Sequence, residues 1–343
     1  MISRVADHCF WFGRYLERAE STARVLAVTQ HLALDAELTP PQCWQPVIIA
    51  LGMRGEFSEL HGEGSAGDGE LVQRYLSFDE SNGTSLRRSC AAARDNARSI
   101  REVVSLEAWE TVNELHLWID NPAVEEEEYA SNRYGFYRRV RQLTQLCLGL
   151  TQSTMLHDTP LDFIWLGVLL ERVGQTARTL DVHHHAFEVD RQGAPGERQV
   201  VETALWLSLL RACSGFEPFM KTSQGLVTGD AVARFLLFEP RFPRSIRHCV
   251  HAAYSRLCDI RPPESVTLPG GESLERLHAL DRWVAEKALE GFDAGAVHEI
   301  LTHVVDETAA ICEGVGRELL GYGPPKSAPP AALGAATAVV GED

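Results

Sequence analysis

The segment FWFGRYLERAESTARVL (residues 10–26) returns later in the chain in a variant form, IWLGVLLERVGQTARTL (residues 164–180). Aligned without gaps at an offset of 154 residues, the two segments are identical at nine of their seventeen positions. A second pair of segments matches in the same order at an offset of 160 residues: VQRYLSFDESNGTSLRRSCAAA (residues 72–93) and VARFLLFEPRFPRSIRHCVHAA (residues 232–253). Self-similarity at a nearly fixed spacing is the signature of an internal repeat.

Helical patterns dominate the rest of the chain. Residues 84–119 begin with Thr and Ser, have an Ala-rich interior and contain neither Gly nor Pro, which is typical of one long helix or two nearly continuous helices. Residues 131–155 and 293–321 carry apolar side chains at the helical period. No convincing run of alternating Val, Ile and Thr predicts a strand.

These patterns predict an all-α helical bundle built from two homologous halves, an internal duplication that packs about a pseudo-twofold axis. The first helical repeat covers residues 1–157 and the second covers residues 158–322. Residues 323–343 form a Pro- and Ala-rich tail that we expect to be disordered.

Composition restricts the function classes. The net charge of −16 disfavours nucleic acid and an anionic membrane surface as partners. The strongest apolar run, FIWLGVLL (residues 163–170), is far too short for a bilayer span, and the first twenty residues contain no uninterrupted apolar core. We therefore expect a cytoplasmic protein without a signal peptide. The eight cysteines form no C-x-x-C pair, so reduced thiols are expected, with no metal and no cofactor.

The repeated segment has one apolar stripe when it is placed on a helical wheel. The stripe consists of Phe12, Leu16, Ala19, Ala23 and Leu26 in the first copy, and of Leu166, Leu170, Val173, Ala177 and Leu180 in the second. Such a stripe is typical of a helix that packs in a core. Charged residues flank it: Glu17 and Arg24 lie on one side, whereas Arg18 lies on the other.

Charges at the border of a core need partners, because a half-buried unpaired ion is costly. One solution is that the two repeated helices pack antiparallel, so that Glu17 meets Arg178 while Arg24 meets Glu171. The other is that the charges line a polar cleft and bind a ligand. If the charges close an interface, we expect Glu17 near Arg178 or Arg172, and Glu171 near Arg24 or Arg18.

The two copies differ in polarity, since Arg14, Tyr15 and Glu20 of the first align with Val168, Leu169 and Gly174 of the second. The first copy therefore has more groups that could hold a ligand. The candidate ligand-binding or interface residues are Arg4, Asp7, Trp11, Arg14, Glu17, Arg18, Arg24, Trp165, Glu171, Arg172 and Arg178.

The paired segments WFGRYLERAESTARVL and WLGVLLERVGQTARTL, together with AARDNARSIREVVSLEAWETVNEL (residues 92–115), resemble the bacterial Alpha-E family, helical proteins named for a recurrent Glu-Arg motif. The resemblance implies a circularly permuted ATP-grasp ligase as partner, and a pathway that makes or attaches a peptide or amide. It also implies a link to a transglutaminase-like or Anbu-type peptidase. Glu17, Arg18, Glu171 and Arg172 match the motif, and the missing counterpart of Arg14 argues against equal function of the two copies.

Three functions remain open at this point. The first is an accessory partner of an ATP-grasp ligase, which binds the acceptor or caps the ligase site. The second is a stand-alone enzyme in which Glu17 or Glu171 acts as a general base. The third is a purely structural adaptor. No P-loop, G-x-S-x-G or Rossmann glycine pattern occurs, so no independent nucleotide site is predicted.

Overall fold

The computed structural model describes residues 3–35, 38–189, 195–223, 227–290 and 292–323. Apart from residue 323, the tail that the sequence predicts to be disordered lies outside the described residues. The helices before the sequence midpoint are α1 (Ser3–Asp35), α2 (Pro40–Ala50), α3 (Arg54–His61), η1 (Ser65–Gly67), α4 (Gly69–Ser77), α5 (Leu86–Ser99), α6 (Leu106–Ile119), η2 (Val124–Tyr129) and α7 (Arg133–Thr154). Those that follow are α8 (Thr159–Val189), α9 (Pro195–Ala212), α10 (Phe216–Thr222), α11 (Gly229–Phe238), α12 (Ile246–Ile260), α13 (Gly271–Leu289), η3 (Ala294–Ala296) and α14 (Val297–Glu318).

Helices make up all the regular secondary structure in these described ranges, which confirms the all-α prediction. The region 84–119 forms two helices rather than one, separated by residues 100–105. Their first turns are capped as the sequence suggests: the Ser85 hydroxyl accepts from the Arg88 amide, and the Ser105 hydroxyl accepts from the Ala108 amide. The predicted boundary at residues 157 and 158 falls in the short connection between α7 and α8.

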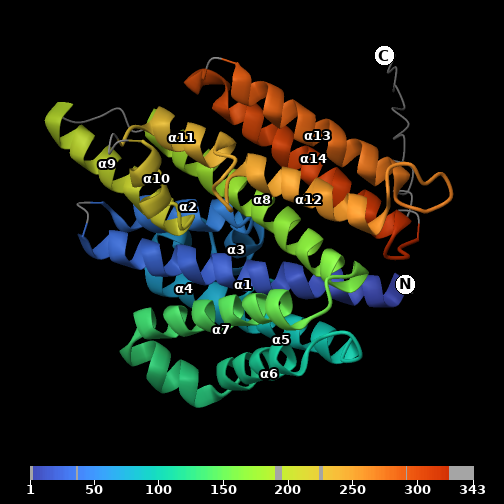
Figure 1. The fold of residues 1–343 in the computed structure, drawn as a ribbon. Coiled ribbons are helices and arrows are strands. Elements are labelled where there is room, and N and C mark those ends of the chain that lie inside the picture. The colour runs from blue at the N-terminus through green and yellow to red at the C-terminus, as the bar shows by residue number, and fades with distance from the viewer. Residues whose placement is uncertain (1–2, 36–37, 190–194, 224–226, 291, 324–343) are drawn as a thin grey trace, which may run out of the picture.

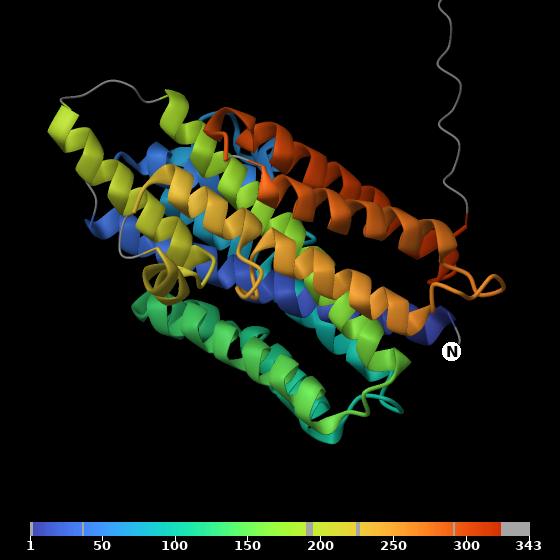
Figure 2. The ribbon, with the colours of Figure 1, turned by 45° about the horizontal axis from the view of Figure 1, so that its top comes forward.

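The two helices that carry the repeated segment, α1 and α8, pack on each other at the centre of the bundle (Figure 1). Helices α5 and α7 pack on α1, and α6 covers them from outside. Helices α12 and α14 pack on α8, with α13 against both. Figures 1 and 2 show the first group on one side of the central pair and the second group on the opposite side.

Helices α1 and α8 run in the same general direction and cross, so the antiparallel packing that was one of the two solutions for the sequence is wrong (Figure 1). Both run from the right of the view to the left. Two glycines explain the close crossing. A Cβ atom at Gly13 would lie 2.0 Å from the carbonyl oxygen of Ile164, and one at Gly167 would lie 2.1 Å from that of Phe10. Any larger residue would force the helices apart.

The apolar stripes of both repeated helices are buried, as predicted: every member is at most 1% exposed. They belong to two core clusters. The larger cluster contains Phe12 and Leu16 of α1 together with the whole stripe of α8, so it joins both predicted repeats. The smaller one contains Ala19, Ala23 and Leu26 with residues of α2 to α7. The charged residues that border the stripes are therefore held between packed helices.

Candidate functional site

Charged side chains meet in two clusters where α1 crosses α8. The Glu17 cluster consists of Glu17, Glu20, Arg24, Arg172 and Arg244. The Glu171 cluster consists of Glu171, Arg14, Arg18, Gln175 and Arg178. Each cluster takes its motif glutamate from one helix and its motif arginine from the other.

In the Glu17 cluster both carboxylates are surrounded by donors. Arg172 donates from Nε and Nη2 to the two oxygens of Glu17, at 3.0 and 2.8 Å. Arg244, from the loop before α12, donates to Glu17 and to Glu20, at 2.7 Å in each case. Glu20 also pairs with Arg24, one turn along α1. Both glutamate side chains are 0% exposed, so this cluster is closed to solvent on its acidic side.

The electrostatics of the Glu17 cluster keep its central carboxylate ionised. Burial raises the pKa of Glu17, but Arg172 and Arg244 outweigh burial and lower that pKa to about 2. Burial, with Arg244 and Arg141 nearby, lowers the pKa of the Arg24 guanidinium to about 9. A general base must have a pKa near the working pH, so Glu17 is unsuited to that role.

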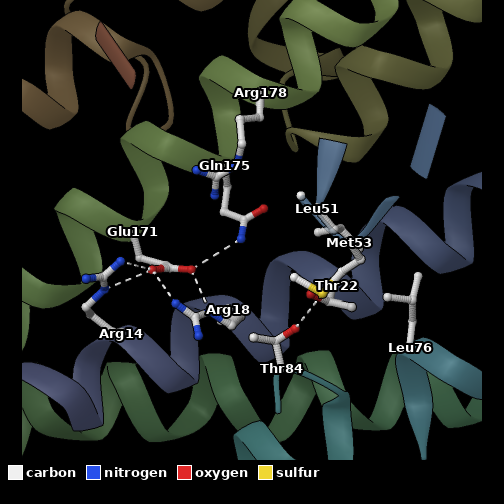
Figure 3. Close-up of a pocket in the computed structure, with 11 residues that line it drawn as sticks. Arg14, Arg18, Thr22, Leu51, Met53, Leu76, Thr84, Glu171, Gln175 and Arg178 are labelled. Carbon is white, nitrogen blue, oxygen red and sulfur yellow. Dashed lines mark hydrogen bonds and ion pairs between the residues drawn. The ribbon is translucent and has the colours of Figure 1, made fainter. Parts of the chain in front are cut away.

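In the Glu171 cluster one carboxylate accepts five hydrogen bonds (Figure 3). Arg14 donates from Nε and Nη2 to one oxygen at 2.9 and 2.7 Å, and Arg18 donates to both oxygens at 2.8 and 3.0 Å. Gln175 adds a bond of 3.2 Å. Burial raises the pKa of Glu171, but Arg18 and Arg14 outweigh burial and hold it well below its ordinary range. Glu171 is therefore an anchor for arginines and not a proton acceptor.

The Glu171 cluster differs from the Glu17 cluster because it lines a cavity of about 260 Å³. The remaining walls are formed by Thr22, Leu51, Gly52, Met53, Leu76 and Thr84. Figure 3 shows the arginines and Gln175 on one side of this space, with Leu51, Met53, Leu76 and Thr84 on the other. Its volume is several times the ~30 Å³ share of a water molecule in the liquid. The cavity can therefore admit a small ligand or one end of a larger one.

Arg178 contributes a cation to the cavity without a carboxylate of its own. Its Nε atom donates to the carbonyl oxygen of Ala50 at the end of α2, at 3.2 Å. Within the described ranges it forms no ion pair. Burial lowers the pKa of its guanidinium, Glu171 opposes that effect, and Arg18 and Arg14 add to it. A bound anion would stabilise such a guanidinium, which is largely buried and has no carboxylate partner.

The structure selects among the partners that the sequence left open. Glu17 lies against Arg172 and Glu171 lies against Arg18, so the motif pairs form across the helix crossing. The alternative pairs do not form, because Arg24 is held by Glu20 and Arg178 by a backbone carbonyl. Both arrangements considered for these charges therefore occur. The Glu17 cluster closes the helix interface, and the Glu171 cluster lines a cavity.

Other candidates from the sequence lie outside the cavity lining. Arg4 is exposed near the start of α1. Asp7 accepts a hydrogen bond of 2.6 Å from the Tyr322 hydroxyl, which in turn accepts from the Trp11 indole. Trp165 is partly buried on α8, and its ring nitrogen has no hydrogen-bond partner among the described residues. The residues Arg4, Asp7, Trp11 and Trp165 therefore do not join the candidate site.

Sequence reasoning missed Arg244, Gln175 and Thr84. Arg244 and Thr84 occupy aligned positions in the second pair of matched segments, and a change from Thr to Arg between aligned positions was a usable signal. Gln175 aligns with Ser21 and carried no such signal. Across the described ranges, no three His, Cys, Asp or Glu side chains are grouped as metal ligands. None of the described helices combines the length and the apolar character that crossing a bilayer requires.

Comparison with known proteins places this architecture in a family. No solved structure matches the chain. Uncharacterized proteins of Mycobacterium bovis and Mycobacterium tuberculosis are 25% identical to it over 281 residues, which is 75% of this chain. The chain spans about 30% of the length of these curated relatives. The profile of the Alpha-E family, described as a predicted alpha-helical domain with a conserved ER motif, matches residues 1–320. The cross-paired Glu17–Arg18 and Glu171–Arg172 are two Glu-Arg pairs within the matched residues, and the chain belongs to the Alpha-E family.

Proposed function

We propose that this Alpha-E protein is the helical accessory partner of a circularly permuted ATP-grasp ligase that forms a peptide or amide bond. In this proposal the cavity beside Glu171 holds an anionic group of a reactant, either to position the acceptor or to cap the ligase site. The observation that carries the proposal is the cavity lining, in which Arg14, Arg18 and Arg178 face a single carboxylate.

The chemistry of such a ligase gives an arginine-lined cavity a task. An ATP-grasp enzyme activates a carboxylate as an acyl phosphate, which an amine then attacks. Arginine recognises carboxylate and phosphate oxygens through paired N–H donors. A helical partner that binds one anionic end of a reactant would orient it and keep water from the activated intermediate.

The relatives support a role beside other protein segments. In the mycobacterial proteins the matched region is part of a chain of which this protein spans about 30%. The two other functions are less well supported. Glu17 and Glu171 have lowered pKa values and are occupied by arginines, which argues against general-base catalysis. A purely structural adaptor would not need an open cavity that contains an unpaired arginine.

We further propose that residues 1–157 and 158–322 are two copies of one ancestral half. Reciprocal contacts support this. Gly13 and Gly167 each approach the other helix, and the two Glu-Arg motifs exchange partners. We also propose that a transglutaminase-like or Anbu-type peptidase acts in the same pathway. The proposed site of action is the cytoplasm, where ATP is available.

Reconstitution with the ATP-grasp ligase of the same organism tests the proposed function. The two proteins are co-expressed, co-purified and supplied with ATP and candidate amines, and the products are analysed by mass spectrometry. The proposal expects a stable complex and a product that depends on both proteins. Equal product formation by the ligase alone, in the absence of any complex, would contradict it.

A further inference from the structure

The unpaired state of Arg178 has a local cause. Arg178 aligns with Arg24 at the offset of 154 residues, and both lie on the stripe-flanking side of their helix. Arg24 pairs with Glu20, but the residue that aligns with Glu20 is Gly174. Nη1 of Arg178 lies 3.2 Å from the point that a Cβ atom on Gly174 would occupy. The glycine thus removes a carboxylate and provides room for the guanidinium above the helix.

The open state of the cavity also has a local cause. Thr84 aligns with Arg244 at the offset of 160 residues. The long side chain of Arg244 reaches into the Glu17 cluster, where it contacts Glu17 and Glu20. The short side chain of Thr84 stops at the cavity wall, and its hydroxyl donates to Asn82 at 2.8 Å. Arg244 therefore fills the Glu17 cluster, whereas the short side chain of Thr84 leaves a space beside the Glu171 cluster.

The charge balance indicates what would occupy that space. Three guanidinium groups and one carboxylate line the cavity, which leaves two positive charges without a protein counter-charge. Partly buried cations without counter-ions are costly. The excess is local, since the chain as a whole has a net charge of −16. An anion with two negative charges would balance the lining.

We propose that the cavity binds a phosphate-type dianion, held by Arg14, Arg18 and Arg178. A phosphate group carries about −1.5 to −2 charges at neutral pH and offers three acceptor oxygens to converging arginines. Leu51, Met53 and Leu76 form an apolar wall that suits the organic part of a phosphate monoester. This inference rests on the proposed function, because it names the ligand class of the same cavity.

Calorimetry of the full chain tests the inference with three probes: inorganic phosphate, phenyl phosphate and acetate. We expect both phosphate compounds to bind more tightly than the monoanion acetate. Tighter binding of phenyl phosphate than of inorganic phosphate would assign the site to a phosphorylated organic molecule, and equal binding would assign it to the phosphate group alone. No heat of binding with either phosphate compound, or equal affinity for acetate, would overturn the inference.

Two variants localise the site. Thr84→Glu places a carboxylate in the cavity that competes with phosphate for the arginines, and Arg178→Gln removes the unpaired charge. Each should weaken phosphate binding by roughly ten-fold or more, which is about 1.4 kcal/mol. Gly83→Glu is the matched control, because it adds the same charge at an exposed neighbour with no atom within 4 Å of its Cβ position. It should bind phosphate like the wild type.

The two variants also keep the inference falsifiable if one of them fails to fold. Full phosphate affinity in either folded variant would overturn it. The calorimetric test needs no ligase, so the outcomes of the two proposals separate. Phosphate binding without any effect on a ligase would contradict the proposed function alone. A ligase effect without phosphate binding would contradict the ligand class alone.

Discussion

Arg172 of α8 donates two hydrogen bonds, of 3.0 and 2.8 Å, to the fully buried carboxylate of Glu17 on α1. The reverse pair, Arg18 on α1 with Glu171 on α8, has distances of 2.8 and 3.0 Å. A glutamate and an arginine that are adjacent in sequence point to different sides of a helix and cannot serve each other. The second copy of the segment supplies the missing partner for each.

The Glu17–Arg172 pair is expected to behave as a buried ion pair. Glu17→Ala or Arg172→Ala should lower the free energy of unfolding by about 3–5 kcal/mol, because each removes a partner of a buried ion. The double variant should cost less than the sum of the two single variants. Urea denaturation of the four proteins measures this coupling. Strictly additive losses would show that the two side chains do not interact.

Arg244 is expected to be a structural residue although it lies in a loop. Arg244→Ala removes one partner from each of two buried glutamates and should also cost about 3–5 kcal/mol. Arg241, three residues earlier, is exposed and pairs only with Glu239 among the described residues, so Arg241→Ala should leave the stability almost unchanged. Thermal melts of both variants give the comparison. Similar melting temperatures would refute the role of Arg244.

Substitution of the glycines at the helix crossing by Ala should change the stability in the opposite direction from the same substitution in an open helix. Ala is a better helix former than Gly by about 1 kcal/mol, so Gly→Ala in an open helix should stabilise. Gly13→Ala and Gly167→Ala should instead destabilise by about 1–3 kcal/mol or more, because the new methyl group meets a backbone carbonyl. Gly149→Ala in α7, where no atom lies within 4 Å, is the control and should stabilise. Denaturant midpoints of the three variants show whether the two crossing variants lose stability while the control gains it.

Glu17 should contribute to acid destabilisation of the protein, together with Glu171. The pKa of Glu17 is near 4.5 in the unfolded chain and about 2 in the folded protein, so the unfolded state binds more protons between these values. The associated stability is present above pH 4.5 and is lost as the pH falls toward 2. A difference of about 2.5 pKa units corresponds to about 3 kcal/mol. Urea denaturation between pH 6 and 2 should show a shallower acid loss for Glu17→Gln, and an unchanged slope would argue against this assignment.

Much of the fold could be predicted from the sequence. The periodic stripe that includes Phe12 and Leu166 predicted which faces are buried, since apolar burial dominates helix packing. The absence of strand patterns predicted the fold class. The relative direction of α1 and α8 could not be predicted. A pattern of stripes alone is compatible with either direction, and the close contacts of Gly13 and Gly167 set only how near the helices approach.

The candidate site was predictable only in part. The sequence predicted Arg178 or Arg172 as the partner of Glu17, because burial of an unpaired ion is costly, and the structure selects Arg172. The difference between Thr84 and the aligned Arg244 was visible in the sequence, but nothing in the sequence places this loop residue beside Glu17, which lies more than 200 residues away. The cavity depends on what is missing, namely a carboxylate at Gly174 and a long side chain at Thr84. These missing groups can be recognised only by comparison with the Glu17 cluster, in which both groups are present.

We propose that the cavity beside Glu171 serves the ligase reaction, whereas the Glu17 cluster stabilises the fold. Product formation by the ATP-grasp ligase in the presence of Thr84→Glu tests this most directly, with Gly83→Glu beside it and the melting temperature of each variant recorded. We predict that Thr84→Glu folds with a melting temperature near that of the wild type, because the arginines of the cavity compensate its charge, and loses most of the ligase support, while Gly83→Glu retains it. Full support of the ligase by a folded Thr84→Glu protein would contradict the claim.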